Sequence, residues 1–269
     1  MAEARARVSL AALEHAAGIR EERRDFGAAL DRHHKKGAAG KDRAAEDLAI
    51  IAELKAASPS AGVLKRDYRP AEIARRYESA GAAALSVLTE EEYFRGSLEH
   101  LKEARAAAGV PVLRKDFILD AYQVYESVAA GADALLLIVA ALADQELRRL
   151  IELADRLRIA ALVEVHTAED LDRAIAAGAK IIGVNNRDLK TLDVNLETSL
   201  RLRPKIPSGC LSVSESGIRS AADLERLHDA GFDAALIGER FMIAEDPGKA
   251  LAEMLGAMEA QSQRSGVRN

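Results

Sequence analysis

Short apolar runs alternate with longer amphipathic stretches from residue 49 to about residue 255. The stretches between the runs, such as RPAEIARRYESA and DQELRRLIELADRLR, have helical periodicity and charged outer faces. Several of them end in an Ala-rich segment followed by glycine, which suits a left-handed helix cap. Eight runs are predicted to be buried strands, and they cover about residues 49–55, 84–88, 111–115, 134–139, 160–165, 181–185, 210–215 and 234–238.

Eight short strands that alternate with helices predict a parallel α/β sheet, and their number and spacing favour a closed (β/α)8 TIM barrel. An open doubly wound sheet is the alternative, but the first strand lacks a Gly-rich dinucleotide-binding turn. Residues 1–48 are predicted to form an N-terminal helical extension of one or two amphipathic helices, with a flexible polar link at 36–47. The barrel is expected to occupy residues 49–260, and residues 261–269 to form a frayed tail.

Composition restricts the environment and the partners. The chain of 269 residues has a formal net charge of -5, which argues against general nucleic-acid or membrane-surface binding. Cys210 is the only cysteine, so no intramolecular disulfide can form and a cysteine-based zinc site is disfavoured. The opening MAEARARVSL lacks the apolar core of a signal peptide, and the run ALLLIVAALA is too short to span a bilayer. We therefore expect a cytoplasmic protein.

Polar residues stand where several predicted strands end. Glu53 and Lys55 end the first strand, Lys115 the third, Glu164 the fifth and Asn185 the sixth. In a TIM barrel, catalytic groups lie at this end of the strands. Each residue taken singly could form a structural ion pair at the rim. Together they favour a site for acid–base chemistry, because so many buried charges are costly unless they are paired or bind a ligand.

The last two strands end in SESGI and IGER, which place Gly217 and Gly238 at the usual phosphate site of this architecture. Glycine lets backbone N–H groups approach an anion closely. A phosphorylated small molecule is therefore the favoured substrate class. His166 lies at the same end of the barrel, but it has no second ligand at metal spacing, and we expect no metal site.

Long blocks of the chain resemble one family. They are IIAELKAASPSAG, LSVLTEEEYFRGSLEHL, VPVLRKDFILDAYQVYE, LVEVHTAEDLDRAI, IIGVNNRDLKTLDVNLETSLRL and VSESGI. They resemble the indole-3-glycerol phosphate synthases of tryptophan biosynthesis, in the expected order over about residues 26–255. The resemblance implies ring closure, decarboxylation and dehydration of 1-(2-carboxyphenylamino)-1-deoxyribulose 5-phosphate, a carboxy-lyase reaction that uses no metal or organic cofactor.

The resemblance also implies roles for individual residues. Lys115 would be the general acid that polarises the ketone, and Glu164 the acid–base residue of dehydration. Glu53 would position Lys115, and Lys55 would bind phosphate and could assist proton transfer, so the division of proton transfers among these four residues stays open. The remaining catalytic residues implied are Asn185, Glu215 and Ser216, although Glu215 and Ser216 have opposite strand parity. The substrate-binding residues implied are Ser58, Phe117, Arg187, Gly217, Leu236, Gly238 and Glu239.

The chain departs from the family pattern at Ala56 and Ala61, where basic residues are common. We expect weaker electrostatic attraction or altered motion of the loop after the first strand. The alternatives are another phosphosugar isomerase, a Schiff-base aldolase using Lys115 or Lys55, or a non-catalytic barrel that binds a partner. The intact set of polar residues argues against the last. We expect a monomer, and the resemblance leaves association with other tryptophan-pathway enzymes open.

Overall fold

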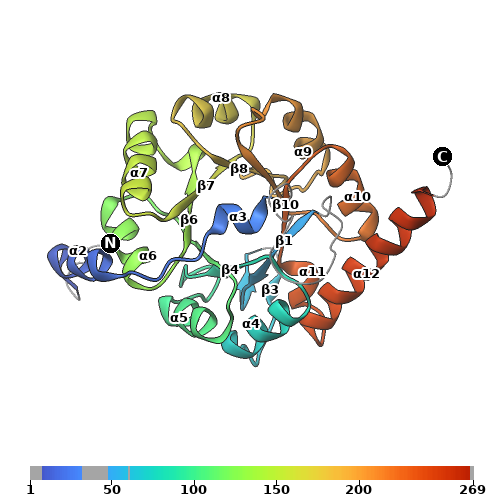
Figure 1. Ribbon diagram of the computed structural model, residues 1–269, viewed down its shortest axis with the longest axis horizontal. Helices are drawn as coiled ribbons and strands as arrows, with labels where there is room; N and C mark the ends of the chain where they lie inside the picture. The colour runs from blue at the N-terminus through green and yellow to red at the C-terminus, as the bar shows by residue number, and fades with distance from the viewer. Residues whose placement is uncertain (1–7, 32–47, 60, 267–269) are drawn as a thin grey trace.

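The computed structural model describes residues 8–31, 48–59 and 61–266. Eight parallel strands form a closed barrel in the order β1-β10-β9-β8-β7-β6-β5-β4 (Figure 1). This closed ring confirms the predicted TIM barrel, and each strand begins and ends within one residue of its predicted position. The strands are β1 (Ala49–Leu54), β4 (Ala84–Leu88), β5 (Val112–Lys115), β6 (Ala134–Ile138), β7 (Ala160–Val165), β8 (Ile181–Asn185), β9 (Leu211–Glu215) and β10 (Ala234–Ile237).

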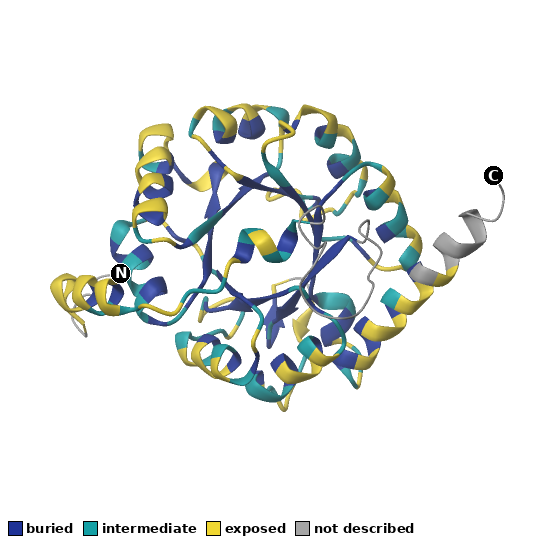
Figure 2. Ribbon diagram, viewed as in Figure 1, coloured by how far each residue is buried: buried dark blue, intermediate teal, exposed yellow. Residues whose placement is uncertain are grey.

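Helices surround the barrel, with buried inner faces and exposed outer faces (Figure 2). In α7, for example, Leu147, Leu150 and Ile151 recur at helical spacing and are buried. The α-helices that follow the strands are α4 (Pro70–Ser79), α5 (Leu98–Ala107), α6 (Ala121–Ala129), α7 (Asp144–Arg156), α8 (Ala168–Ala176), α9 (Glu197–Leu202), α10 (Ala221–Asp229), α11 (Glu239–Met242) and α12 (Pro247–Gly266). Two 3-10 turns are η1 (Val139–Ala141) and η2 (Arg203–Lys205). Helix α12 continues past residue 260, where we expected a frayed tail to begin.

Strand alternation separates two apolar cores. Val163 and Val165 on β7 pack in the core between the strands and the helices, whereas Leu162 belongs to a second core inside the barrel. Ile51, Leu113, Leu162 and Val213 all lie in this inner core. Two residues further along each strand, the same parity carries Glu53, Lys115, Glu164 and Glu215. Charged side chains therefore lie directly above the apolar interior, at the carboxyl ends of the strands.

The N-terminal extension closes the opposite end of the barrel. Its described helices are α2 (Leu10–Ile19), which packs on α6, and α3 (Phe26–Leu30), which lies over the middle of the ring of strands (Figure 1). Phe26 and Leu30 are buried in the inner core with residues such as Ala49 and Ala134, which begin their strands. This arrangement confirms the predicted N-terminal helices. The polar link expected at 36–47 lies outside the described residues.

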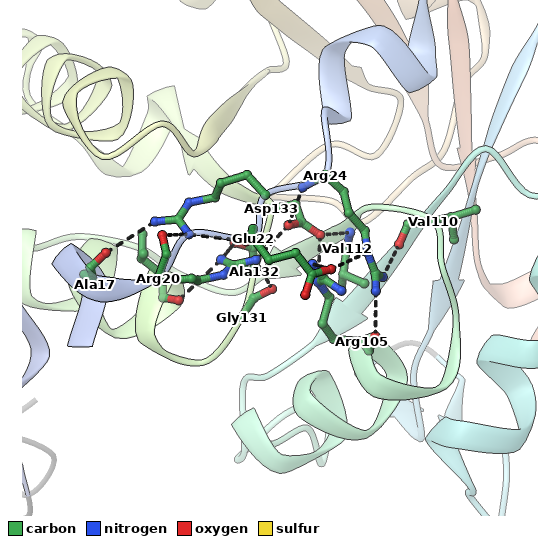
Figure 3. A network of polar contacts seen from close by, with 12 residues as sticks. Ala17, Arg20, Glu22, Arg24, Arg105, Val110, Val112, Gly131, Ala132 and Asp133 are labelled. Atoms are coloured by element: carbon green, nitrogen blue, oxygen red, sulfur yellow. Dashed lines mark hydrogen bonds and ion pairs between the residues drawn. The ribbon is translucent and has the colours of Figure 1, made fainter. Parts of the chain in front are cut away.

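A buried carboxylate joins the segment between α2 and α3 to the barrel (Figure 3). The side chain of Asp133 is fully buried and accepts hydrogen bonds from Nη2 of Arg20 at 2.8 Å and from the backbone N–H groups of Arg24 and Val112 at 3.1 and 3.0 Å. Arg20 and Arg24 donate to Oδ1, and Nε of Arg105 lies 3.1 Å from Oδ2, which also accepts from Val112. Burial raises the pKa of Asp133, and the two guanidinium groups and the Val112 N–H oppose that shift. The network therefore depends on every partner being present.

A two-stranded hairpin follows β1 and was not predicted. Its strands are β2 (Ala57–Ser58) and β3 (Gly62–Val63), and the backbone N–H groups of Leu64 and Lys65 donate to the carbonyl of Ala56. The ammonium of Lys65 donates to the carbonyls of Ala244 and Glu245, at 2.6 and 3.0 Å. The hairpin thereby stands beside the loop that follows α11.

Replacing Asp133 with Asn should lower the free energy of unfolding by about 3–5 kcal/mol, because Arg20 loses its buried anion and Arg105 keeps only the exposed carboxylate of Glu22. Urea denaturation followed by circular dichroism measures this change. Asp155→Asn is the control, since it breaks an exposed ion pair with Lys180 and should cost less than about 1 kcal/mol. Equal, small losses in both variants would contradict a stabilising role for the network.

Candidate active site

The carboxyl ends of the strands surround a cavity of about 310 Å³. Ten predicted site residues line it, and they are Glu53, Lys55, Ser58, Lys115, Phe117, Glu164, Asn185, Arg187, Ser216 and Glu239. A second hollow of about 250 Å³ shares Lys55, Arg187, Ser216 and Glu239 with the cavity and is also lined by Gly217 and Gly238. Two predicted residues line neither space: Glu215 is buried beneath the cavity, and Leu236 belongs to the inner core.

The ion pair at the end of β1 is buried. Nζ of Lys55 lies 2.8 Å from Oε1 of Glu53, and their side chains are 13% and 5% exposed. The neighbouring strand β10 ends just before Gly238. A Cβ atom at Gly238 would collide with Oε1 of Glu53, so glycine is required here by the close approach of the carboxylate. The carboxylate of Glu53 thus lies at the cavity, beside Gly238.

Lys115 lies between two carboxylates from different strands. Its Nζ is 3.2 Å from Oε2 of Glu164 and 3.2 Å from Oε2 of Glu215. Gly183 on β8 leaves room for this arrangement, since a Cβ atom there would collide with Oε1 of Glu215. The three charged groups come from β5, β7 and β9, so closure of the barrel is what brings them together.

Glu164 and Glu215 share one ammonium group but have different protonation states. Burial raises the pKa of Glu215 to about 8, and the charge of Glu164 adds to this effect while Lys115 opposes it. Burial also acts to raise the pKa of Glu164, but Lys115, His166 and a hydrogen bond from Asn185 outweigh it and hold that pKa below its usual value. Burial acts to lower the pKa of Lys115, yet the surrounding carboxylates raise it. Near neutral pH the site therefore holds an ammonium, a carboxylate and a protonated acid.

The loop after β8 places Arg187 at the edge of the cavity. Its backbone N–H donates to Oδ1 of Asn185 at 3.0 Å, and its guanidinium donates to the carbonyl of Leu192 at 3.0 Å. The guanidinium is also 3.9 Å from Glu239, a longer ion pair. It therefore stands where the cavity meets the second hollow.

The opposite parity of Glu215 and Ser216 has a backbone explanation. Strand β9 ends at Glu215, and Ser216 and Gly217 then adopt left-handed conformations with φ of 66° and 76°. Strand alternation stops there, so both side chains serve the same end of the barrel. The side chain of Asn186 donates to the Ser216 carbonyl at 3.0 Å and accepts from the Ser199 N–H at 3.0 Å.

Sequence reasoning missed Asn186 and the apolar wall of the cavity. The paired asparagines in GVNNRDL were a signal for Asn186, but only the fold shows that its side chain supports the turn after β9. The wall includes Phe94, Leu136, Ile138 and Leu192. Leu136 and Ile138 share the inward parity of Ala134 on β6, which could have identified them.

No group of three or more His, Cys, Asp or Glu side chains within residues 8–31, 48–59 and 61–266 is arranged to hold a metal ion. Nor does that part of the chain contain a helix long and apolar enough to cross a membrane.

Comparison with known proteins identifies the family. The sequence model of indole-3-glycerol phosphate synthase matches residues 1–254. The chain belongs to the indole-3-glycerol phosphate synthase family. The indole-3-glycerol phosphate synthase of Polaromonas naphthalenivorans is 52% identical over 233 residues, which are 87% of this chain and 85% of that protein. That of Chloroherpeton thalassium is 53% identical over 222 residues, 82% of each. The expected enzyme class, a carboxy-lyase of tryptophan biosynthesis, is confirmed.

Solved structures of other families share the barrel. A thiamine phosphate pyrophosphorylase from Pyrococcus furiosus has a TM-score of 0.60 at 19% identity and covers 80% of this chain and 97% of its own. A mutant mandelate oxidase with benzaldehyde has a TM-score of 0.62 at 20% identity, with 94% of each chain covered. These likenesses support the fold alone, because one barrel carries many chemistries.

Replacing Glu215 with Gln should flatten the pH dependence of stability between about pH 5 and 8. The folded protein keeps a proton on Glu215 in this range that the unfolded chain releases, so the free energy of unfolding falls as pH rises. Urea titrations across the range measure the slope. Glu152→Gln, at an exposed position on α7, should leave the slope unchanged. Parallel curves for the native protein and Glu215→Gln would contradict the raised pKa.

Replacing Gly238 with Ala should lower kcat/KM by about 10²-fold, because the new methyl group displaces the carboxylate of Glu53. Gly256→Ala is the matched control: its Cβ would meet open space in α12, and it should add about 0.5–1 kcal/mol of stability without affecting turnover. Unchanged activity in Gly238→Ala would show that Glu53 tolerates displacement.

Proposed function

We propose that this chain converts 1-(2-carboxyphenylamino)-1-deoxyribulose 5-phosphate to indole-3-glycerol phosphate, carbon dioxide and water. The observation that carries the proposal is the position of Lys115, with its Nζ 3.2 Å from both Glu164 and Glu215 at the mouth of the barrel. An acid held between two potential bases suits a sequence of proton transfers at one substrate. Family membership supplies the identity of that substrate.

The two connected spaces suit the two ends of this substrate. The second hollow, with Lys55, Gly217 and Gly238, would take the phosphate through the ammonium and backbone N–H groups. The larger cavity, with Phe117 and the wall of Phe94, Leu136, Ile138 and Leu192, would take the carboxyphenyl ring. Arg187 stands between them and would meet the ring carboxylate. Ser58 and the Glu239 backbone would complete the contacts to the phosphate end.

Ring closure is the first step. The ring carbon that carries the carboxylate attacks the ketone carbon, and Lys115 gives a proton to the ketone oxygen, which becomes a hydroxyl group. Carbon dioxide then leaves, and the electron pair of its bond restores the aromatic ring. The raised pKa of Lys115 keeps it protonated before the reaction. A protonated amine is a poor nucleophile, which argues against a Schiff-base aldolase.

Dehydration follows at the same carbon. A general acid protonates the new hydroxyl group, which leaves as water with its bonding electrons. A base takes a proton from the adjacent methylene carbon, and the indole double bond forms. Glu164 is the proposed acid–base residue because it is ionised beside Lys115, while Asn185 and Ser216 would orient the intermediate. The ion pair of Glu53 and Lys55 would supply further proton exchange.

Several further expectations from the sequence remain proposals. The protein acts in the cytoplasm as a monomer, without a nucleic-acid or membrane partner, and can meet other enzymes of tryptophan biosynthesis. Catalysis uses no metal or organic cofactor. Ala56 and Ala61 reduce the positive charge of the hairpin region, which either weakens attraction of the phosphate or alters the motion of this loop, without changing the chemistry.

Replacing Lys115 with Ala should reduce kcat for indole formation by about 10²–10⁴-fold, because the ketone loses its acid. The measurement is the rise of indole fluorescence from the carboxyphenylamino-deoxyribulose phosphate, with carbon dioxide release recorded in parallel. Lys115→Met preserves more packing volume and should be equally impaired. Lys102→Ala, on the exposed side of α5, is the control and should retain full activity.

Absence of indole formation by folded native protein would overturn the proposed function. Borohydride trapping of a substrate–lysine adduct would instead support an aldolase. Indole formation that survives both substitutions at Lys115 would preserve the reaction and contradict the assigned acid.

A further inference from the structure

His166 is buried beside the proposed acid–base residue without lining the cavity. It follows β7 directly, and its side chain is only 9% exposed. Its Nε2 lies 3.3 Å from Oε1 of Glu164, whereas the ammonium of Lys115 lies 3.2 Å from the other oxygen, Oε2. The Glu164 carboxylate is therefore held on one oxygen by lysine and approached on the other by imidazole.

The backbone fixes His166 in this place. Its N–H donates to Oδ2 of Asp170 at 3.1 Å, and the same oxygen accepts from the N–H of Thr167 at 3.2 Å. The Thr167 hydroxyl accepts in turn from the Asp170 N–H, which completes the capping box of α8. The turn from β7 into α8 thus presents the imidazole to Glu164 independently of the substrate.

The ring itself has unmet hydrogen-bonding capacity. Within the part of the chain that the structure describes, neither Nδ1 nor Nε2 of His166 forms a hydrogen bond of good geometry. Nε2 is nevertheless at ion-pair distance from Glu164, so a small rotation of either side chain would make the bond. A buried polar group without a partner is costly, which favours a state of the site in which this bond forms.

The proposed reaction gives a reason for a state in which His166 hydrogen-bonds Glu164. In the free protein, Lys115 is shared by Glu164 and Glu215. When Lys115 turns to the ketone oxygen, Glu164 loses a positively charged neighbour just before it must act as a base. The other acidic groups near Glu164 and His166 are Glu215 on β9, which holds a proton near neutral pH and supplies no positive charge, and Asp170 on α8, which is engaged with backbone N–H groups. Asn185 keeps its hydrogen bond to Glu164, and the imidazole of His166 is placed to supply a second one.

We propose that His166 is a positioning residue that donates from Nε2 to Oε1 of Glu164, keeping this carboxylate ionised and oriented while Lys115 is engaged with substrate. The inference rests on the proposed function for its kinetic consequence. It assigns His166 no contact with substrate, and it requires the tautomer, or the imidazolium, that carries a proton on Nε2.

Two substitutions separate the hydrogen bond from packing. His166→Phe keeps a planar ring and removes the donor, and it should lower kcat by about 10- to 100-fold with little change in KM, as expected for loss of a hydrogen bond to a charged group. His166→Gln carries an amide N–H and should recover most of that loss. His228→Phe, on α10 away from the cavity, controls for a general effect of replacing histidine and should retain native kinetics.

The pH profile distinguishes positioning from a structural role. Loss of the donor raises the pKa of Glu164, so the acid limb of kcat should move to higher pH in His166→Phe and return toward native in His166→Gln. Carboxyl carbon NMR of Glu164 measures the same pKa shift in protein without substrate. This second readout does not depend on turnover.

The outcomes are separable. An inactive native protein with the expected NMR shift would overturn the proposed function and preserve the contact between His166 and Glu164. An active native protein whose acid limb and Glu164 titration are unchanged in His166→Phe would overturn the inference. Equal losses in His166→Phe and His166→Gln, with unaltered pH profiles, would also overturn it, since that pattern indicates packing alone.

Discussion

The site depends on one ammonium shared by two buried carboxylates. Lys115 lies at equal distances from Glu164 and Glu215, and neither acid could be buried so deeply in ionised form without a cation beside it. Since one positive charge cannot fully compensate two negative charges, the pair divides: Glu164 stays ionised and Glu215 holds a proton. Lys115 and Glu215 are therefore protonated within hydrogen-bonding or ion-pair distance of the network that contains the ionised Glu164.

This arrangement follows from the alternation of inward and outward side chains along the barrel strands. Inward positions carry apolar side chains through the middle of the strands and charged ones at their carboxyl ends, so the charged groups rest on a packed apolar floor. Small residues provide the remaining space, because Gly183 and Gly238 lie against the carboxylates of Glu215 and Glu53. The reactive groups are therefore held by rigid strands, and the loops add the phosphate hollow and the rim.

The two ends of the barrel use buried charge differently. At the N-terminal end, Asp133 meets Arg20, Arg105 and backbone N–H groups, and the segment that supplies Arg20 leads into the helix α3 that closes the barrel. There the partners are numerous and the charges are enclosed. At the carboxyl end, Lys115 and Glu164 face a cavity, and His166 has hydrogen-bonding capacity in reserve. Such incomplete satisfaction suits a site that must exchange partners during a reaction.

The sequence by itself determined the eight strands, the alternation that turns Glu164 inward with Leu162, and the polar residues at the strand ends, because periodicity and strand parity are local properties. Long matching blocks also indicated the family. Tertiary structure alone decided that Lys115 contacts Glu164 and Glu215, that α3 closes the barrel, and that His166 lies beside Glu164. Leu236, implied as a binding residue, lies in the inner core. The reason is geometric: contacts between β5, β7 and β9 depend on strand stagger and barrel closure, which join residues as far apart as 115 and 215 and leave no local pattern in the chain.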